Sequence, residues 1–128
     1  MTKKRKRIII VDDDVEFLEE LSEVLEDSGY ETVAFTEGAP AIHEAYDNSP
    51  DLVLLELHLG GKSGFLVATE LTRMQKTAGI PILGITGHYS GKMVADLMNI
   101  IGFRGCLLKP LDPEKLLSSI EEILEQKG

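Results

Sequence analysis

The stretch PDLVLLELHLGGKSG, residues 50–64, decides the fold of this chain. Its unbroken apolar run, 52–55, follows a Pro-Asp turn, as expected for a strand buried on both faces of a parallel sheet. The glycine-rich segment 60–64 then interrupts the pattern and predicts a flexible loop. Glu56 lies between the run and the loop, so a carboxylate marks the end of a central strand. In open α/β sheets, ligands gather at the carboxyl ends of strands.

The chain's size and charge indicate one acidic domain behind a short basic tail. Its 128 residues suit a single core, and 43% hydrophobic with 27% charged residues is ordinary for a globular protein. All residues from 3 to 7 are Lys or Arg, whereas the other residues carry 8 positive against 22 negative charges. We therefore expect a basic tail at 1–7 and a domain at 8–126. The excess of negative charge on this domain argues against nucleic-acid binding by it.

The chain is not expected to associate with a membrane. No apolar run approaches the roughly 20 residues that span a bilayer. Cys106 is the one cysteine and has no partner for an internal disulfide, which is typical of a reducing compartment. A cytoplasmic location is the expectation.

Apolar periodicity predicts five strands alternating with five helices. The strands are expected at 8–11, 30–35, 52–55, 82–85 and 106–108. The helices are expected from 15 to a C′ glycine at 29, around 41–46 after a cap at Thr36, at 65–76, at 93–101 before Gly102, and from Pro113 after a cap at Asp112. This alternation with short connections predicts an α/β fold, a parallel sheet with helices on both faces.

Polar residues follow four of these strands and should meet in one crevice. They are Asp12 and Asp13, Glu56, Thr86, and Lys109. Nearby carboxylates repel one another, so they favour a hard cation such as Mg²⁺ or a lysine as partner. A lysine and a threonine hydroxyl can both donate to phosphoryl oxygens. The set therefore predicts a phosphoryl-binding site.

Each member also has a plainer interpretation. Asp14 is better explained as the cap of the first helix, and Thr86 or Lys109 alone would be an ordinary strand end or surface charge. His58 and His88 follow two of the strands, and with the carboxylates they offer an alternative Zn²⁺ or Mn²⁺ site, although no local ligand spacing supports one.

Four segments occur in order along the chain: Ile-Ile-Val-Asp-Asp-Asp at 9–14, the 50–64 stretch, Ile-Thr-Gly at 85–87 and Leu-Lys-Pro at 108–110. Together they resemble the receiver domain of two-component response regulators, and the chain is similar to stand-alone, chemotaxis-type CheY-like receivers. The resemblance covers residues 8–126. It implies a flavodoxin-like, doubly wound, five-stranded sheet of strand order 2-1-3-4-5.

The resemblance also implies roles for the crevice residues. Mg²⁺ would be held by Asp12, Asp13 and the carbonyl of His58, with Glu56 at the same site. Thr86 and Lys109 would contact a phosphoryl group, and the bond from Lys109 to Pro110 would be cis.

Three positions depart from the family's pattern. Glu56 stands where the family carries its phosphoacceptor aspartate, so we expect impaired or absent phosphotransfer and weak or absent Mg²⁺. Cys106 stands at the aromatic switch position. Gly60 stands where a proline is expected, which predicts a looser loop.

The leading hypothesis is therefore an atypical receiver, not an enzyme, that regulates a histidine kinase or an output protein by docking. The main alternative is a small Mg²⁺-dependent phosphatase of the haloacid-dehalogenase type, which the Val11 to Val15 segment also resembles. Asp12 would be the nucleophile and Asp14 the acid–base, with Thr86 and Lys109 assisting. A third interpretation is an ordinary receiver whose aspartate was replaced by design.

The family's partner surface would combine the fourth helix, fifth strand and fifth helix, and a homodimer across it is a further expectation. The fourth helix is unusually apolar. Helical spacing places Met93, Leu97 and Ile101 on one side and turns Ile100 away.

Overall fold

A five-stranded parallel sheet organises the computed structural model, which describes residues 4–87 and 91–127. Its order is β2-β1-β3-β6-β7, which confirms the predicted order 2-1-3-4-5 once a small separate hairpin, β4–β5, is set aside. The sheet strands are β1 (Arg7–Val11), β2 (Glu31–Phe35), β3 (Leu52–Glu56), β6 (Ile82–Thr86) and β7 (Gly105–Leu108). Arg7, expected in the tail, is thus the first residue of β1.

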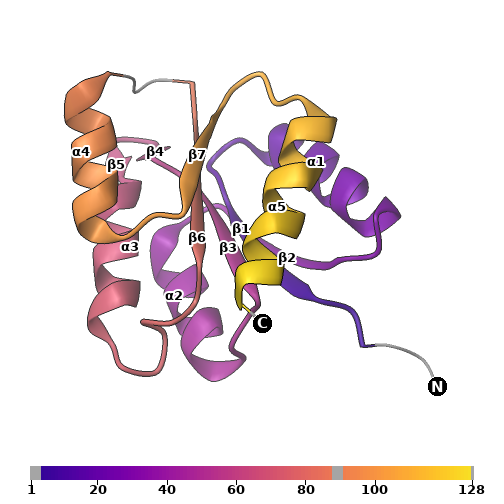
Figure 1. Cartoon of the computed structure of the whole chain (residues 1–128), viewed down its shortest axis with the longest axis horizontal. Coiled ribbons are helices and arrows are strands. Elements are labelled where there is room, and N and C mark those ends of the chain that lie inside the picture. The colour runs from indigo at the N-terminus through magenta and orange to yellow at the C-terminus, as the bar shows by residue number, and fades with distance from the viewer. Residues whose placement is uncertain (1–3, 88–90, 128) are drawn as a thin grey trace.

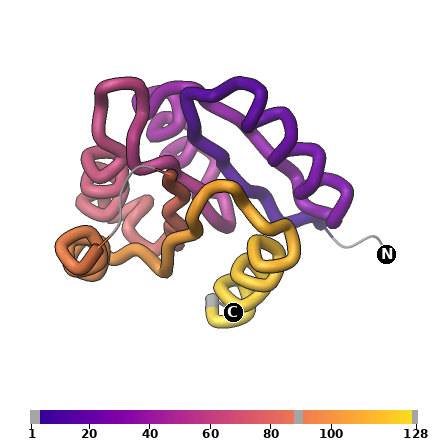
Figure 2. Tube along the Cα trace, turned by 90° about the horizontal axis from the view of Figure 1, so that it is seen from above, coloured from indigo at the N-terminus to yellow at the C-terminus, as the bar shows by residue number. Residues whose placement is uncertain are grey.

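Five helices cover the two faces of this sheet (Figures 1 and 2). They are α1 (Val15–Asp27), α2 (Gly38–Asp47), α3 (Gly64–Arg73), α4 (Lys92–Ile101) and α5 (Pro113–Lys127). Helices α1 and α5 pack on one face, and α2, α3 and α4 pack on the other. The fold is the predicted flavodoxin-like, doubly wound arrangement.

Alternation along the central strands divides the core into two layers. In β1, Ile8 and Ile10 pack toward α1 and α5, whereas Ile9 and Val11 pack toward α2 and α3. All four are at most 1% exposed, and β3 is buried throughout. A strand with two buried faces has no room for polar residues until it ends, which is why the polar groups of this chain collect at the sheet edge.

Most predicted helix ends are confirmed. The Asp14 carboxylate accepts the Phe17 N–H at 3.2 Å at the start of α1, and the Asp112 carboxylate accepts the Glu114 N–H at 3.0 Å at the start of α5. Gly102 ends α4 in the left-handed region, with φ 104°.

Two helix ends were predicted wrongly. Glu37, not Thr36, is the N-cap of α2, and its side chain makes no capping hydrogen bond. The third helix ends at Arg73, three residues before the predicted end. The cause is Thr77, whose buried hydroxyl donates to the carbonyl of Leu71 at 2.6 Å and so turns the chain back on the helix end.

The glycine-rich segment forms a short hairpin where a loop was predicted. Strands β4 (His58–Leu59) and β5 (Lys62–Ser63) form an antiparallel hairpin around Gly60 and Gly61. Both glycines have positive φ, as a tight two-residue hairpin turn requires. Gly64 is buried, and a Cβ there would lie 2.2 Å from the Glu56 carbonyl oxygen. This glycine therefore lets α3 begin directly against the end of β3.

The apolar face of α4 also differs from the prediction. Met98 and Val94 pack on the core, whereas Met93 is 84% exposed and lies outside it. Ile100, which was predicted to be turned away from Met93, is 82% exposed on the same outward face, because residues seven apart lie two helical turns apart. Within the described ranges, no helix has the length and apolar character needed to cross a membrane.

Candidate functional site

Asp12 lies just beyond the carboxyl end of β1 with its side chain buried. Its backbone N–H donates to the Phe35 carbonyl at 3.1 Å, which fixes it at the sheet edge. The carboxylate Oδ1 accepts the Asp14 N–H at 2.9 Å, and Oδ2 accepts from the Lys109 ammonium at 2.7 Å. Both oxygens of this buried acid therefore have partners.

Glu56 is the last residue of β3 and is only 1% exposed. Its Oε1 lies 2.9 Å from Lys109 Nζ, and its Oε2 accepts the His58 N–H at 3.1 Å. The second contact ties the carboxylate to the end of its own strand. The first contact links the centre of the sheet to the segment after β7.

Lys109 is the cation shared by these two acids. Its backbone N–H donates to the Thr86 carbonyl at 2.9 Å, so β6 places the start of the side chain. Its ammonium also lies 4.1 Å from the centroid of the Phe17 ring. A cation over an aromatic face is favourable, and more so where water is excluded.

One lysine is shared between two buried acids. Burial raises the pKa of Asp12, and hydrogen bonds from Lys109 and the Asp14 N–H offset this only in part. Burial lowers the pKa of Lys109, but its hydrogen bonds to Asp12 and Glu56 outweigh burial and raise that pKa overall. The lysine is therefore charged at neutral pH, and the site is a compact ionic triad.

The other predicted site residues surround this triad. Thr86 ends β6 and is fully buried at the same sheet edge. Asp13 is exposed at the rim beside the hairpin, where a Cβ on Gly60 would lie 3.2 Å from its Oδ2. The peptide bond from Lys109 to Pro110 is cis, as the resemblance implied.

The acidic residues do not form a ready metal site. Across residues 4–87 and 91–127, no three His, Cys, Asp or Glu residues are grouped so as to hold a metal ion. Lys109 supplies the countercharge that a cation would otherwise provide to Asp12 and Glu56. A divalent cation would therefore have to displace Lys109 from Asp12 before it could bind there. His88, which the alternative Zn²⁺ or Mn²⁺ site requires, lies outside the described residues.

Sequence reasoning missed Phe17 as a residue of the site. The Leu18, Leu21 and Leu25 stripe of α1 packs on the core, and Phe17 falls beside that stripe and is half-buried. A large aromatic residue next to the apolar stripe, within one turn of an acidic strand end, was the available signal.

Cys106 lies in β7, opposite Gly84 of β6. A Cβ on Gly84 would lie 3.4 Å from the Cys106 sulfur and 2.9 Å from Cε of Met98. Glycine here lets Met98 and the small thiol pack over the strand. Burial, and then the negative charge of Glu56, raise the pKa of this thiol.

Comparisons with known proteins agree on one family. The model of the response regulator receiver domain matches residues 8–121. The protein PilH of Pseudomonas aeruginosa is 31% identical over 120 residues, covering 92% of this chain and 97% of PilH. The chain spans about half the length of other curated relatives, 53% and 54% in two cases.

Solved structures agree in fold. A CheY-like receiver domain protein from Methanospirillum hungatei has a TM-score of 0.89 and 25% identity, covering 97% of each chain. A response regulator from Burkholderia pseudomallei, solved with a phosphorylated aspartic acid, a calcium ion and citrate, has a TM-score of 0.82 and 25% identity, covering 94% of this chain and 69% of its own. With the family model matching most of its length, the chain belongs to the response regulator receiver domains of two-component signalling.

Proposed function

We propose that this chain is an atypical receiver of a phosphorelay that regulates a partner by docking, without ordinary phosphotransfer. One observation carries the proposal. Lys109 Nζ lies 2.9 Å from Glu56 Oε1 and 2.7 Å from Asp12 Oδ2. The ammonium that is expected to donate to a phosphoryl oxygen therefore already contacts two carboxylates.

Glutamate is a poor replacement for an acceptor aspartate on geometric grounds. Its extra methylene moves the carboxylate by about 1.5 Å. In-line attack tolerates little error, and a misplacement of about 1 Å costs on the order of a hundredfold in rate. The Burkholderia response regulator carries its phosphoryl group on an aspartic acid. Compared with that aspartic acid, Glu56 has the same type of acidic group on a side chain that is one methylene too long.

The longer side chain of Glu56 also brings its carboxylate to Lys109, so Glu56 partly imitates a phosphorylated acceptor. It presents one negative charge to Lys109, where a phosphoryl group would present nearly two. The ion pair links β3 to the end of β7 without any added group. We infer that this chain is held in one signalling state instead of switching.

Mg²⁺ binding follows from the same contacts. Receiver domains typically bind Mg²⁺ at the phosphorylation site, and here Asp12 must first release Lys109. We therefore propose weak Mg²⁺ binding through Asp12 and Asp13, with Glu56 and the His58 carbonyl as the further candidate ligands.

The docking surface that we propose lies on α4 and β7. Met93, Ile100 and Leu108 are 84%, 82% and 63% exposed. Large apolar side chains gathered on neighbouring elements suit a protein partner such as a kinase or an output protein. The phosphatase alternative gains no support, because the Asp14 carboxylate has the plainer role of capping α1.

A phosphodonor experiment tests the proposal. The chain and its Glu56→Asp variant are each incubated with acetyl phosphate and Mg²⁺ and then weighed intact by mass spectrometry. We expect no added phosphoryl group on the parent and an adduct on the variant, because the shorter side chain restores in-line distance and frees Lys109. Glu56→Gln is the control and should remain unlabelled.

A stoichiometric adduct on the parent, mapped to Glu56 or Asp13, would contradict the altered-acceptor proposal. No adduct on either protein, under conditions that label an ordinary receiver, would mean that the crevice has lost more than the acceptor. The domain would then act by docking alone.

A further inference from the structure

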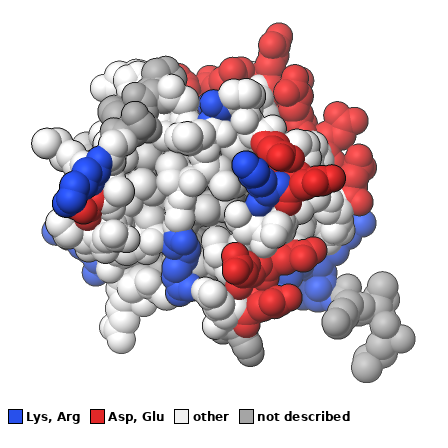
Figure 3. Space-filling view, turned by 45° about the horizontal axis from the view of Figure 1, so that its top comes forward, with Lys and Arg blue, Asp and Glu red and all other residues white. Residues whose placement is uncertain are grey.

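Charge is divided between two parts of this chain. Residues 8–61 contain 15 Asp and Glu and no Lys or Arg, directly after the basic run at 3–7. Figure 3 shows the consequence on the surface, where acidic side chains crowd the side that carries α1. An acidic surface is by itself an ordinary feature of a protein, but this one lies beside a groove.

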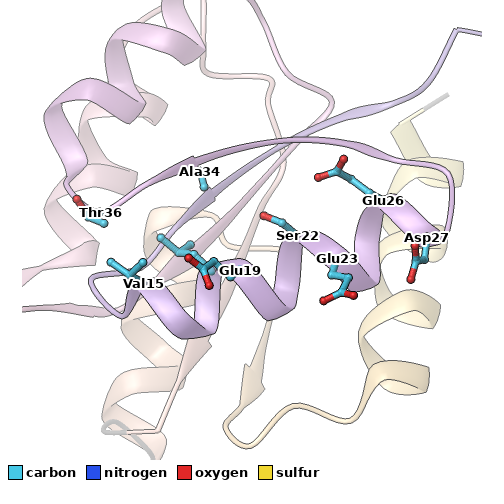
Figure 4. Close-up of a pocket in the computed structure, with 9 residues that line it drawn as sticks. Val15, Glu19, Ser22, Glu23, Glu26, Asp27, Ala34 and Thr36 are labelled. Atoms are coloured by element: carbon cyan, nitrogen blue, oxygen red, sulfur yellow. The ribbon is translucent and has the colours of Figure 1, made fainter.

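The groove runs between α1 and the edge strand β2, with a volume of about 630 Å³ (Figure 4). We call it the α1–β2 groove. Small or apolar residues line it, among them Leu18, Ser22 and Ala34, and so do Glu19, Glu23, Glu26 and Asp27. Among the residues that the structure describes, no Lys or Arg forms an ion pair with Glu19 or Glu23.

The chain's own basic segment turns away from this groove. Lys4, Arg5 and Lys6 are exposed and line a different cleft, beside Asn48 and Ser49 after α2. Arg7 holds them there, because its guanidinium pairs with Glu44 and its N–H donates to Asp51 at 2.8 Å. The segment therefore leaves the groove of its own molecule open.

Spacing matches the basic segment to the groove. Glu19 and Glu23 lie one helical turn apart, about 6 Å along α1. In an extended segment, Lys4 and Lys6 point to the same side, also roughly 6.6 Å apart. The three residues from Lys4 to Lys6 span about 10 Å when extended, which fits within the roughly 18 Å that α1 covers from Val15 to Asp27.

We propose that the α1–β2 groove binds the Lys4 to Lys6 segment of a second copy of this chain. Two molecules that exchange these segments form a closed, symmetric dimer in which each contact is made twice. Both copies carry a net charge of −9, and this repulsion acts mainly beyond contact distance, where salt screens it. The dimer should therefore be weak and favoured by intermediate salt. The proposal does not depend on Glu56 or on the proposed function.

A charge-swap experiment by analytical ultracentrifugation tests this dimer. The groove variant is Glu19→Lys/Glu23→Lys, and the segment variant is Lys4→Glu/Lys6→Glu; all four positions are exposed, so folding should be unaffected. Each variant alone should remain monomeric at concentrations where the parent dimerises. An equal mixture should dimerise again, because each groove then meets a segment of opposite charge.

The matched control is Glu70→Lys/Asp96→Lys, which makes the same charge change on α3 and α4, across the sheet from the groove. It should dimerise as the parent does. A parent that stays monomeric up to millimolar concentration, or a mixture that fails to associate, would overturn the proposal.

Two further outcomes would assign the surfaces differently. A dimer that survives both charge variants and is lost in Ile100→Lys would place the interface on α4 and overturn the proposal. A synthetic peptide of residues 1–7 that binds the groove of a strictly monomeric parent would also overturn it, and would make a basic segment of another protein the occupant.

Discussion

At the scale of single residues, the site is governed by one lysine shared between two buried acids. Asp12 and Glu56 are each 1% exposed, and Lys109 is the cation that pairs with both. Removing one member of such a group costs more than the pair is worth, because buried charge is left without a partner. The stability of the domain is therefore coupled to the residue that phosphotransfer would use.

Lys109→Met should lower the free energy of unfolding by about 3 kcal/mol, as expected when a buried pair loses one partner. Millimolar Mg²⁺ should restore part of this loss, because a cation can then occupy the freed position between the carboxylates. Urea denaturation with and without Mg²⁺ measures both effects. Lys115→Met, at an exposed position on α5, is the control. Equal stability of the two variants would contradict the role of Lys109.

Cys106 should react slowly with alkylating reagents. Its raised pKa means less thiolate at any pH below that pKa, and the thiolate is the reactive form. At pH 8 we therefore expect a lower alkylation rate than in the urea-unfolded chain, where the thiol has its ordinary pKa. Glu56→Gln should accelerate the reaction by removing the nearby negative charge. An alkylation rate that is the same in the folded and unfolded chains would disprove the expectation.

At the scale of elements, patterns of local origin were predictable and contacts between distant segments were not. The five strands, and the caps by Asp14 and Asp112, follow from runs, periods and neighbouring residues. The early end of α3 depends on Thr77 folding back on that helix, and no periodicity encodes this contact. The crevice set was predictable because parallel strands bring their ends together, whereas Phe17 depends on where the Lys109 side chain goes.

Gly64→Ala tests the close approach of α3 to β3. A Cβ would meet the Glu56 carbonyl oxygen at 2.2 Å and the Leu57 Cα at 2.9 Å, and backbone atoms cannot move aside as side chains do. We expect a loss of about 3 kcal/mol in the free energy of unfolding, at the upper end of overpacking costs. Gly79→Ala is the matched control, because a Cβ there meets nothing within 4 Å. A Gly64→Ala variant as stable as this control would refute the prediction.

At the scale of the whole molecule, the clustering of acidic residues destabilises the folded state. The acidic half contains no basic residue from 8 to 61, and several of its carboxylates line one groove. Like charges held close together destabilise the compact state. The ion pairs of Arg7 with Glu44 and Glu31 relieve this at the foot of the sheet, far from most of α1.

Salt should therefore stabilise the monomer. Raising NaCl from about 0.02 M to about 0.5 M shortens the screening length from roughly 20 Å to roughly 4 Å, so repulsion along α1 fades while contact pairs persist. Each kcal/mol of repulsion removed should raise the midpoint of thermal unfolding by about 3 °C in a domain of this size.

In the Glu19→Lys/Glu23→Lys variant, the midpoint of thermal unfolding at low salt should be higher than in the parent, and its change with salt should be smaller. Glu70→Lys/Asp96→Lys alters the net charge equally but lies where acids and bases are balanced, so it should keep most of the response. Calorimetry at concentrations where the chain is monomeric measures all three, and equal salt responses would show that net charge matters and its placement on α1 does not.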